Sequence, residues 1–266
     1  MKKLILFAFA ASLVFASASA ATKATKTATK ETKKATAEKL NVTNSKLTGD
    51  EKLGYEAGYK ATLIGKSDPF TMKIPGSVAY QKGYKAGLAQ HAFDEGMKVG
   101  ATIDARFDYS KIPPFNNSKQ ACENWIKGYK SMYTIALAGW TAGYDAYEKS
   151  GDNCVVPAAY SKNSTLYKNH YKKAHDNAVQ VYQYYISEYR RGYETTGEIL
   201  RDDIPSRPMG EDDSPDTRTW FQKMFDDLSD EVYYGFKNPK DAFSRKFSDG
   251  FMAGYGDKKA GKPARY

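Results

Sequence analysis

The sequence predicts an all-α protein in which tandem helical hairpins form a bundle or a short solenoid, preceded by a disordered N-terminal tail. Three observations predict this fold. A motif of two glycines and an aromatic residue recurs along the chain. The two glycines of the motif are spaced by one helical turn. No run of residues alternates at the period of two that is typical of a half-buried strand.

The composition sets limits on the class of protein. The chain has 266 residues, of which 41% are hydrophobic and 14% aromatic, with 21 tyrosines. This aromatic content is too high for a disordered chain, and the sequence is too polar for a protein with several membrane spans. Two cysteines and three histidines exclude a disulfide-dense scaffold and a Cys/His zinc module.

Residues 1–20 have the pattern of a secretory signal peptide. Lys2 and Lys3 precede an apolar stretch, and Ala18-Ser19-Ala20 is a small-residue cleavage site that would leave Ala21 as the mature N-terminus. A retained anchor helix is the alternative. No later stretch approaches ~18 consecutive apolar residues, so we expect no stable membrane span after signal removal and a periplasmic or secreted protein.

The net charge of +9 is concentrated near the two ends of the sequence. Residues 21–39 are a low-complexity tail of alanine, threonine and lysine, with six lysines against two glutamates. Residues 256–266 form a second basic tail, and the body between the tails is about neutral. We expect both tails to be flexible. They would either contact a polyanion or act as solubilising spacers.

The repeated motif has the form Gly-aromatic-x-x-Gly. Its clear copies begin at Gly54, Gly83, Gly139 and Gly250 and end at Gly58, Gly87, Gly143 and Gly254. A looser copy runs from Gly96 to Gly100. A glycine inside a helix costs ~1 kcal/mol relative to alanine, so its repeated use indicates the close approach of a neighbouring helix.

A longer repeat surrounds the motif. Tyr80 lies eleven residues after Pro69, Trp125 lies eleven residues after Pro114, and each is followed three residues later by Gly-Tyr. Proline-containing or polar loops are expected between the helices because proline cannot continue a helix. The predicted helices cover residues 50–64, 77–106, 119–149, 163–200, 216–235 and 240–256.

These elements suggest a division of the chain into parts. After the signal peptide (1–20) and the tail (21–39), residues 40–200 form a domain of helical-hairpin repeats. Residues 201–215, which are rich in proline and acidic residues, form a linker. Residues 216–266 form a C-terminal helical hairpin with the basic tail.

The first repeat resembles the ribosome modulation factor family. The shared pattern is Gly-Tyr-x-Ala-Gly, then Gly-Lys-Ser, a proline, an aromatic residue and Gly-Tyr. Its residues here are Gly54, Tyr55, Ala57, Gly58, Gly65, Lys66, Ser67, Pro69, Tyr80, Gly83 and Tyr84. Members of the family are small bacterial helical hairpins that bind the ribosome and hold it inactive. The resemblance implies the hairpin fold and nucleic-acid binding, although this chain carries several units.

Residue patterns for catalysis or for metal binding are missing from the sequence. It contains no HExxH, GxSxG or Walker motif and no paired-cysteine spacing for zinc. His91 and Glu95 lie four residues apart, but no third ligand is indicated. We therefore expect no enzyme, no metal and no cofactor.

The two cysteines could form a disulfide, because an exported chain meets oxidising conditions. Cys122 lies near the start of the helix predicted for residues 119–149, and Cys154 lies just beyond its end. Such a helix would separate the two by ~45 Å, whereas a disulfide joins Cα atoms ~4.4–6.8 Å apart. A bridge would need a break in the helix, so the pairing is left open.

The leading functional hypothesis is an exported, non-enzymatic binding or structural protein of the bacterial envelope or exterior, with a phage origin left open. Its partner would be a protein or an envelope polymer, bound by a flat or concave aromatic face. One alternative is a nucleic-acid-binding protein, which would bring together Lys60, Lys66, Lys82, Lys85, Lys127 and Lys130. A second alternative is a cell-wall-acting hydrolase with a buried carboxylate in a cleft.

Overall fold

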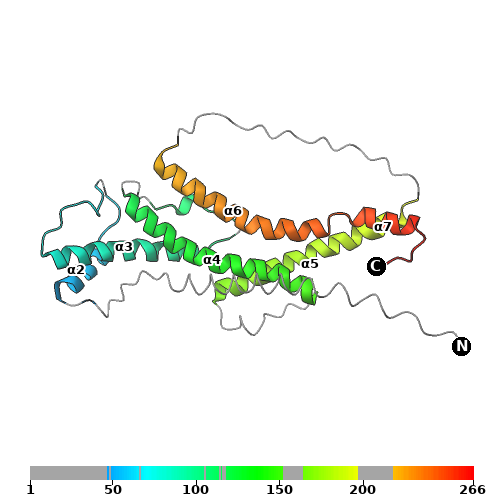
Figure 1. The fold of residues 1–266 in the computed structure, drawn as a ribbon, viewed down its shortest axis with the longest axis horizontal. Helices are drawn as coiled ribbons and strands as arrows, with labels where there is room; N and C mark the ends of the chain where they lie inside the picture. The colour runs from blue at the N-terminus through cyan, green and yellow to red at the C-terminus, as the bar shows by residue number, and fades with distance from the viewer. Residues whose placement is uncertain are drawn as a thin grey trace.

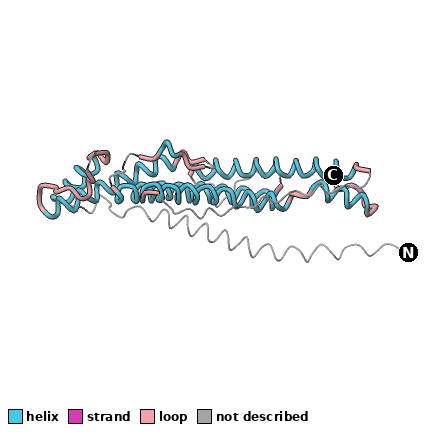
Figure 2. The backbone as a smooth tube through the Cα atoms, turned by 90° about the horizontal axis from the view of Figure 1, so that it is seen from above, coloured by secondary structure: helices cyan, strands magenta, loops and turns pink. Residues whose placement is uncertain are grey.

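The protein is an elongated stack of helices in a computed structural model (Figures 1 and 2). The structure describes residues 47, 49–65, 67–104, 106–113, 115, 118–151, 164–196 and 218–266. Its elements are α2 (Gly49–Lys60), α3 (Val78–Gly100), the 3-10 helix η2 (Tyr109–Lys111), α4 (Lys119–Ser150), α5 (Thr165–Glu194), α6 (Trp220–Lys246) and α7 (Gly250–Lys259). The predicted all-α fold is confirmed, and none of the described residues forms a strand.

Hydroxyl side chains mark the starts of the long helices. Ser77, Ser118 and Ser164 precede α3, α4 and α5, and each hydroxyl accepts a hydrogen bond from a backbone N–H in the first turn. Thr219 begins α6 with a full capping box, in which the Gln222 side chain accepts a hydrogen bond from the Thr219 backbone N–H. These caps satisfy backbone donors that have no partner inside the helix.

The paired helices run in the same direction. A Cβ atom added at Gly54 of α2 would meet the carbonyl oxygen of Tyr80 in α3, and one added at Gly58 would meet the carbonyl oxygen of Tyr84. Both contacts advance by four residues together, which requires parallel helices. The expectation of hairpins, in which the two helices would be antiparallel, is therefore wrong for these pairs, and the 17 residues between α2 and α3 carry the chain back to the start of the next parallel helix.

The helices are staggered along the long axis of the molecule. The first half of α3 packs on α2, and its second half packs on the first half of α4. The second half of α4 packs on the first half of α5, and the second half of α5 packs on α7. Helices α3, α4 and α5 therefore each bridge two neighbours, which lengthens the stack as Figure 2 shows.

Helix α6 lies along α4 (Figure 1). Its phenylalanines contact the aromatic rings of α4. Its buried residues are Phe225, Leu228, Val232, Phe236 and Phe243. They belong to one hydrophobic core with α3 and α4 residues such as Leu88, Trp125 and Trp140. The segments on the two sides of the expected linker 201–215 thus share a core, while 201–215 itself lies outside the described residues.

The prediction for residues 216–256 needs two corrections. We expected a break between helices 216–235 and 240–256, but α6 continues through Pro239 to Lys246, and the break follows at Phe247. Proline removes one backbone hydrogen bond, and the apolar contacts of Phe236 and Phe243 hold the helix on both sides of it. The two helices also do not form a hairpin, because α6 packs on α4 and α7 packs on α5.

None of the helices within the described ranges is both long enough and apolar enough to cross a bilayer.

Candidate binding surfaces

The predicted glycines lie in the contacts between helices. Gly54 and Gly58 of α2 face Gly83 and Gly87 of α3, and all four are buried. A Cβ added at any of them would lie 2.0–2.1 Å from a carbonyl oxygen of the opposite helix. This spacing excludes every larger residue and permits Cα–H···O contacts between the backbones. The glycines are therefore structural and are not placed to hold a ligand.

The same geometry recurs in the next pair with an altered sequence. Gly96 and Gly100 of α3 face α4, where Gly128 is the first facing residue and Met132 the second. The carbonyl that opposes Gly96 belongs to Trp125, which lies three residues before Gly128. In the first pair the carbonyl that opposes Gly54 belongs to Tyr80, which likewise lies three residues before Gly83. In both repeats, therefore, the residue three positions before Gly-Tyr supplies the backbone carbonyl that the first glycine of the partner helix meets.

The third pair replaces a facing glycine by histidine. Gly139 and Gly143 of α4 approach the carbonyl oxygens of Tyr167 and Tyr171 in α5, and a Cβ at either glycine would lie 2.3 Å away. His170 occupies the position held by Gly83 and Gly128 in the other pairs. It is buried against Phe236, and its Nδ1 lies 3.0 Å from the carbonyl of Leu166. Burial lowers the pKa of His170, so its ring is neutral at pH 7.

The fourth pair has the reverse order in the sequence. Gly250 and Gly254 of α7 pack against the carbonyl oxygens of Tyr185 and Tyr189 in α5, and Gly192 of α5 opposes Phe251. The aromatic-x-x-Gly-Tyr element comes first here, and the Gly-aromatic-x-x-Gly element follows almost 60 residues later. The pairing thus depends on local complementarity of the two elements and not on their order in the chain.

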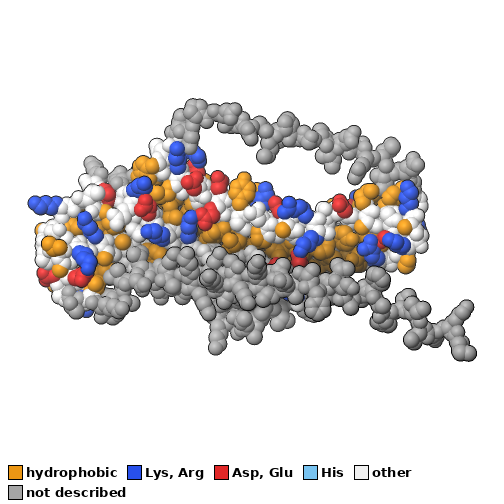
Figure 3. Space-filling model, in the orientation of Figure 1, with side chains coloured by type: hydrophobic (Ala, Val, Ile, Leu, Met, Phe, Trp, Pro, Cys, Tyr) orange, Lys and Arg blue, Asp and Glu red, His pale blue; other side chains and the backbone are white. Residues whose placement is uncertain are grey.

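Five of the six lysines proposed for a polyanion lie on the described helices α2, α3 and α4. Lys60, Lys85 and Lys127 are exposed on α2, α3 and α4. Lys82 pairs with Glu51 at 2.8 Å, and Lys130 pairs with Glu231 of α6. The sixth, Lys66, lies outside the described residues. On the face seen in Figure 3, basic and acidic side chains are intermixed, which weakens attraction of a polyanion there.

The first of the two cysteines is buried in the core and free. Cys122 lies in the first turn of α4, where its Sγ is 3.6 Å from the carbonyl oxygen of Phe115. Helix α4 runs unbroken from Lys119 to Ser150, so the break that a disulfide would need does not occur within it. Cys154 lies outside the described residues.

A hollow of about 340 Å³ lies between α4 and α6 beside Pro239. Asp145 and Glu148 of α4 and Lys246 of α6 line it, together with Thr141 and Asn238. Lys246 pairs with Glu148. Burial raises the pKa of the Asp145 carboxyl group, although Lys149 and Lys246 partly oppose this shift. A carboxyl group with a raised pKa in a hollow is what the hydrolase alternative requires, but the other acid of the lining, Glu148, is held in the ion pair with Lys246.

The outer face of α6 carries exposed aromatic side chains. Tyr233 is 38% exposed and Tyr234 is 53% exposed, with their ring centroids 5.1 Å apart. The Lys237 ammonium group lies 5.2 Å and 5.9 Å from the two centroids. We call these three residues the α6 aromatic patch. On the inner face, Tyr133 and Trp140 of α4 donate hydrogen bonds to the carbonyls of Glu231 and Phe236, which fixes the helix beneath the patch.

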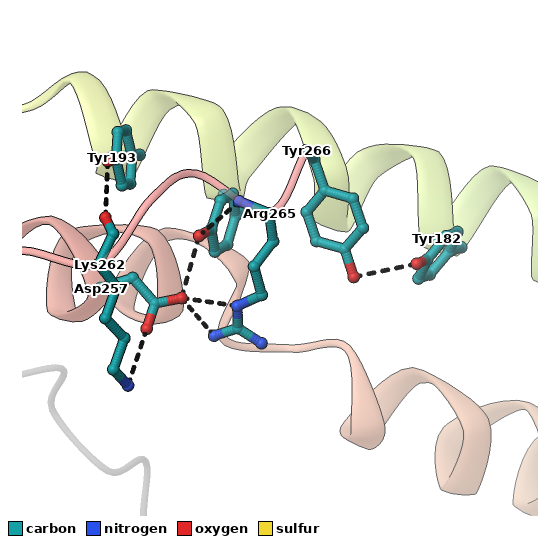
Figure 4. Close-up of polar contacts among 7 residues, drawn as sticks. Tyr182, Tyr193, Asp257, Lys262, Arg265 and Tyr266 are labelled. Carbon is teal, nitrogen blue, oxygen red and sulfur yellow. Dashed lines mark hydrogen bonds and ion pairs between the residues drawn. The ribbon is translucent and has the colours of Figure 1, made fainter. Parts of the chain in front are cut away.

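The second basic tail is held against α5 (Figure 4). Asp257 of α7 is 6% exposed and binds the guanidinium group of Arg265 at 2.6 Å and the ammonium group of Lys262 at 3.4 Å. The ring of Tyr266 meets the rings of Tyr182, Tyr185 and Tyr189 edge-on. The expectation of a flexible tail is therefore wrong for residues 256–266: residues 256–259 belong to α7, and the Asp257 carboxylate and a row of tyrosines bind the segment that follows.

The sequence contains a pattern that could have indicated the α5 side of this contact with the C-terminal residues. Tyr182, Tyr185, Tyr189 and Tyr193 are spaced by three or four residues and so follow one face of α5. This spacing indicates one packed face of a helix but does not indicate what packs on it. The counterpart is the pair Arg265 and Tyr266, whose position the sequence does not indicate.

Comparison with known proteins gave no relative. The chain matches no family model, no curated protein and no solved structure.

Proposed function

We propose that this chain is an exported, non-enzymatic binding or structural protein of the bacterial envelope or exterior. Its partner would be a protein or an envelope polymer that docks on the α6 aromatic patch. The observation that carries this proposal is the exposure of Tyr233 and Tyr234 on a helix whose opposite face is fixed to the core. The signal-like residues 1–20 support export.

The chemistry of the patch suits macromolecular recognition. Tyrosine supplies a large contact area at low cost in conformational entropy, and it is enriched among the residues that dominate binding energy. The rings of Tyr233 and Tyr234 present both apolar faces and hydroxyl groups, and Lys237 adds a positive charge. A rigid support beneath the patch lowers the entropic cost of binding. Exposed aromatic residues on a fixed helix are thus suited to a protein surface or a glycan.

The docking test uses the chain from Ala21 immobilised and exposed to envelope extract. We expect a variant with Tyr233→Ser and Tyr234→Ser to lose the partner that the wild-type chain retains. Tyr184→Ser is the matched control, because Tyr184 is 67% exposed but lies on α5. Equal recovery of the same partner by all three proteins would refute the role of the patch.

Export is tested separately by fractionating cells that express the full chain. We expect the protein in the periplasm or the medium, with a mass that corresponds to an N-terminus at Ala21. A full-length mass in the cytoplasmic fraction would refute export.

A further inference from the structure

The segment Lys262–Tyr266, which we call the clasp segment, is bound along α5 as a peptide ligand would be. Tyr193 donates a hydrogen bond of 2.7 Å to the carbonyl oxygen of Lys262. The backbone N–H of Arg265 donates to the hydroxyl oxygen of Tyr189 at 3.2 Å. Tyr182 donates to the hydroxyl oxygen of Tyr266 at 3.0 Å. Tyrosine side chains of one helix thus contact both the backbone and the side chains of the segment (Figure 4).

The second part of the contact is electrostatic. Asp257 is almost fully buried and accepts hydrogen bonds from Tyr189 at 3.0 Å and from Arg265 Nε at 2.6 Å. The Arg265 guanidinium group also lies over the ring of Tyr189, 5.3 Å from its centroid. A cation that meets both a carboxylate and an aromatic face is recognised by its charge and by its planar shape.

We propose that the tyrosine row of α5, together with Asp257, is a groove for an extended peptide that carries Lys-x-x-Arg-Tyr, and that the clasp segment fills it in cis. The partner in trans is a peptide segment of another protein with the same order of cation and aromatic residue. This inference deepens the proposed binding function and lies on a surface separate from the α6 aromatic patch.

The clasp segment lies beyond the last helix, and a backbone hydrogen bond from the Lys262 N–H to the Asp257 carbonyl oxygen, 2.9 Å long, joins it to the end of α7. Helix α7 ends at Lys259, and Gly261 follows with φ of +67°, in open space. Pro263 favours an extended conformation of Lys262, which suits binding along a groove. The ring of Tyr266 is still 41% exposed. A peptide from another protein would therefore make contacts equivalent to those of the clasp segment. It would have to compete with the clasp segment, whose effective concentration is high because it is tethered to the groove.

The test uses the full chain from Ala21 with Arg265→Ala and Tyr266→Ala, a variant we call the emptied chain because the groove loses the Arg265 and Tyr266 side chains while Lys262 stays in place. The probe is the labelled peptide Gly-Lys-Pro-Ala-Arg-Tyr, and fluorescence anisotropy measures its binding. We expect saturable binding to the emptied chain, and binding at least about tenfold weaker to the wild-type chain, whose own segment competes. Adding Tyr184→Ser to the emptied chain is the matched control and should leave the affinity unchanged.

Reversing the charge of the peptide tests whether Asp257 recognises the positive charge of its arginine. We expect the emptied chain to bind the arginine peptide at least about tenfold more tightly than the same peptide with glutamate in its place. Asp257→Asn, which keeps the shape of the side chain, should remove this preference. Equal binding of the two peptides, or no binding by an emptied chain with the circular dichroism spectrum of the wild type, would overturn the proposal.

A second copy of the chain is the competing occupant. If wild-type chains form a concentration-dependent dimer in sedimentation and the emptied chain does not, the groove serves self-association and the proposal of an external peptide is overturned. Failure of the docking test on Tyr233 and Tyr234 would leave these peptide measurements unaffected, so the two proposals can fail separately.

Discussion

Gly96 of α3 lies directly against the backbone carbonyl of Trp125 in α4. A Cβ atom at position 96 would be 1.9 Å from that oxygen, well inside any real van der Waals distance. Because the obstacle is backbone and not a flexible side chain, the helices could accept a methyl group only by moving apart. Such a movement would also loosen the burial of Trp125, which is 1% exposed in the centre of the core.

Replacement of Gly96 should therefore destabilise the fold. We expect Gly96→Ala to lower the free energy of unfolding by about 2–3 kcal/mol, even though alanine favours a helix, because overpacking of this kind commonly costs that much. Gly256→Ala is the matched control, since nothing lies within 4 Å of a Cβ at Gly256 of α7. That change should stabilise by up to ~1 kcal/mol. Urea unfolding measures both, and a Gly96→Ala protein as stable as the control would contradict the packing.

Gly235 of α6 and Tyr133 of α4 form a second pair that can be tested by a double-mutant cycle. A Cβ at position 235 would lie 1.8 Å from the Tyr133 hydroxyl, but 3.0 Å from the ring carbon that carries it. Gly235→Ala should destabilise, and Tyr133→Phe should cost about 1 kcal/mol through loss of the bond to the Glu231 carbonyl. In the double variant the 1.8 Å contact is removed and the tight but milder 3.0 Å contact with the ring carbon remains, so we expect the destabilisation of the double variant to be well below the sum of the two single effects. Strict additivity would show that the two residues are not in contact.

The raised pKa of Asp145 gives a pH-dependent prediction. Because burial raises this pKa in the folded state, the folded chain binds a proton more readily than the unfolded chain, and stability rises as pH falls through the raised pKa toward ~3.9. Asp145→Asn mimics the neutral form. We expect it to be more stable than the wild type at pH 7, with a gap that shrinks on acidification. Thermal melts at pH 7 and pH 4 measure this, and a constant gap would show that charge burial is not its cause.

The burial of Cys122 predicts an unreactive thiol. Burial raises its pKa to about 12, so the thiol is protonated at pH 8 and is also shielded by the core. In a Cys154→Ser variant, which leaves Cys122 as the one thiol of the chain, we expect no reaction with a disulfide reagent until urea unfolds the protein. Rapid reaction of the folded variant would mean that the start of α4 opens readily.

Several features of the fold could be predicted from local sequence. The spacing of Gly54 and Gly58 placed both on one helix face, and the cost of glycine in a helix indicated close packing. The positions of the long helices followed from Gly-aromatic motifs and from proline-containing loops. The break predicted before residue 240 was wrong. The local rule that proline ends a helix does not include the tertiary contacts that hold α6 on both sides of Pro239.

The candidate surfaces were less accessible to prediction. The ion pairs of Lys82 with Glu51 and of Lys130 with Glu231 could not be predicted, since they join residues distant in the sequence. Tyr189 and Asp257 lie 68 residues apart and are joined by a hydrogen bond. A local sequence pattern cannot indicate a contact between residues so far apart in the chain.

By itself, the sequence determined that the chain is helical and that its helices approach closely at glycine, because side-chain size and the period of a helix are properties of each segment alone. The tertiary structure decided that the paired helices run in parallel, that α7 returns to α5, and that the basic tail is bound by Asp257. These outcomes depend on which complementary surfaces meet after the loops close, and that choice is made by the whole chain.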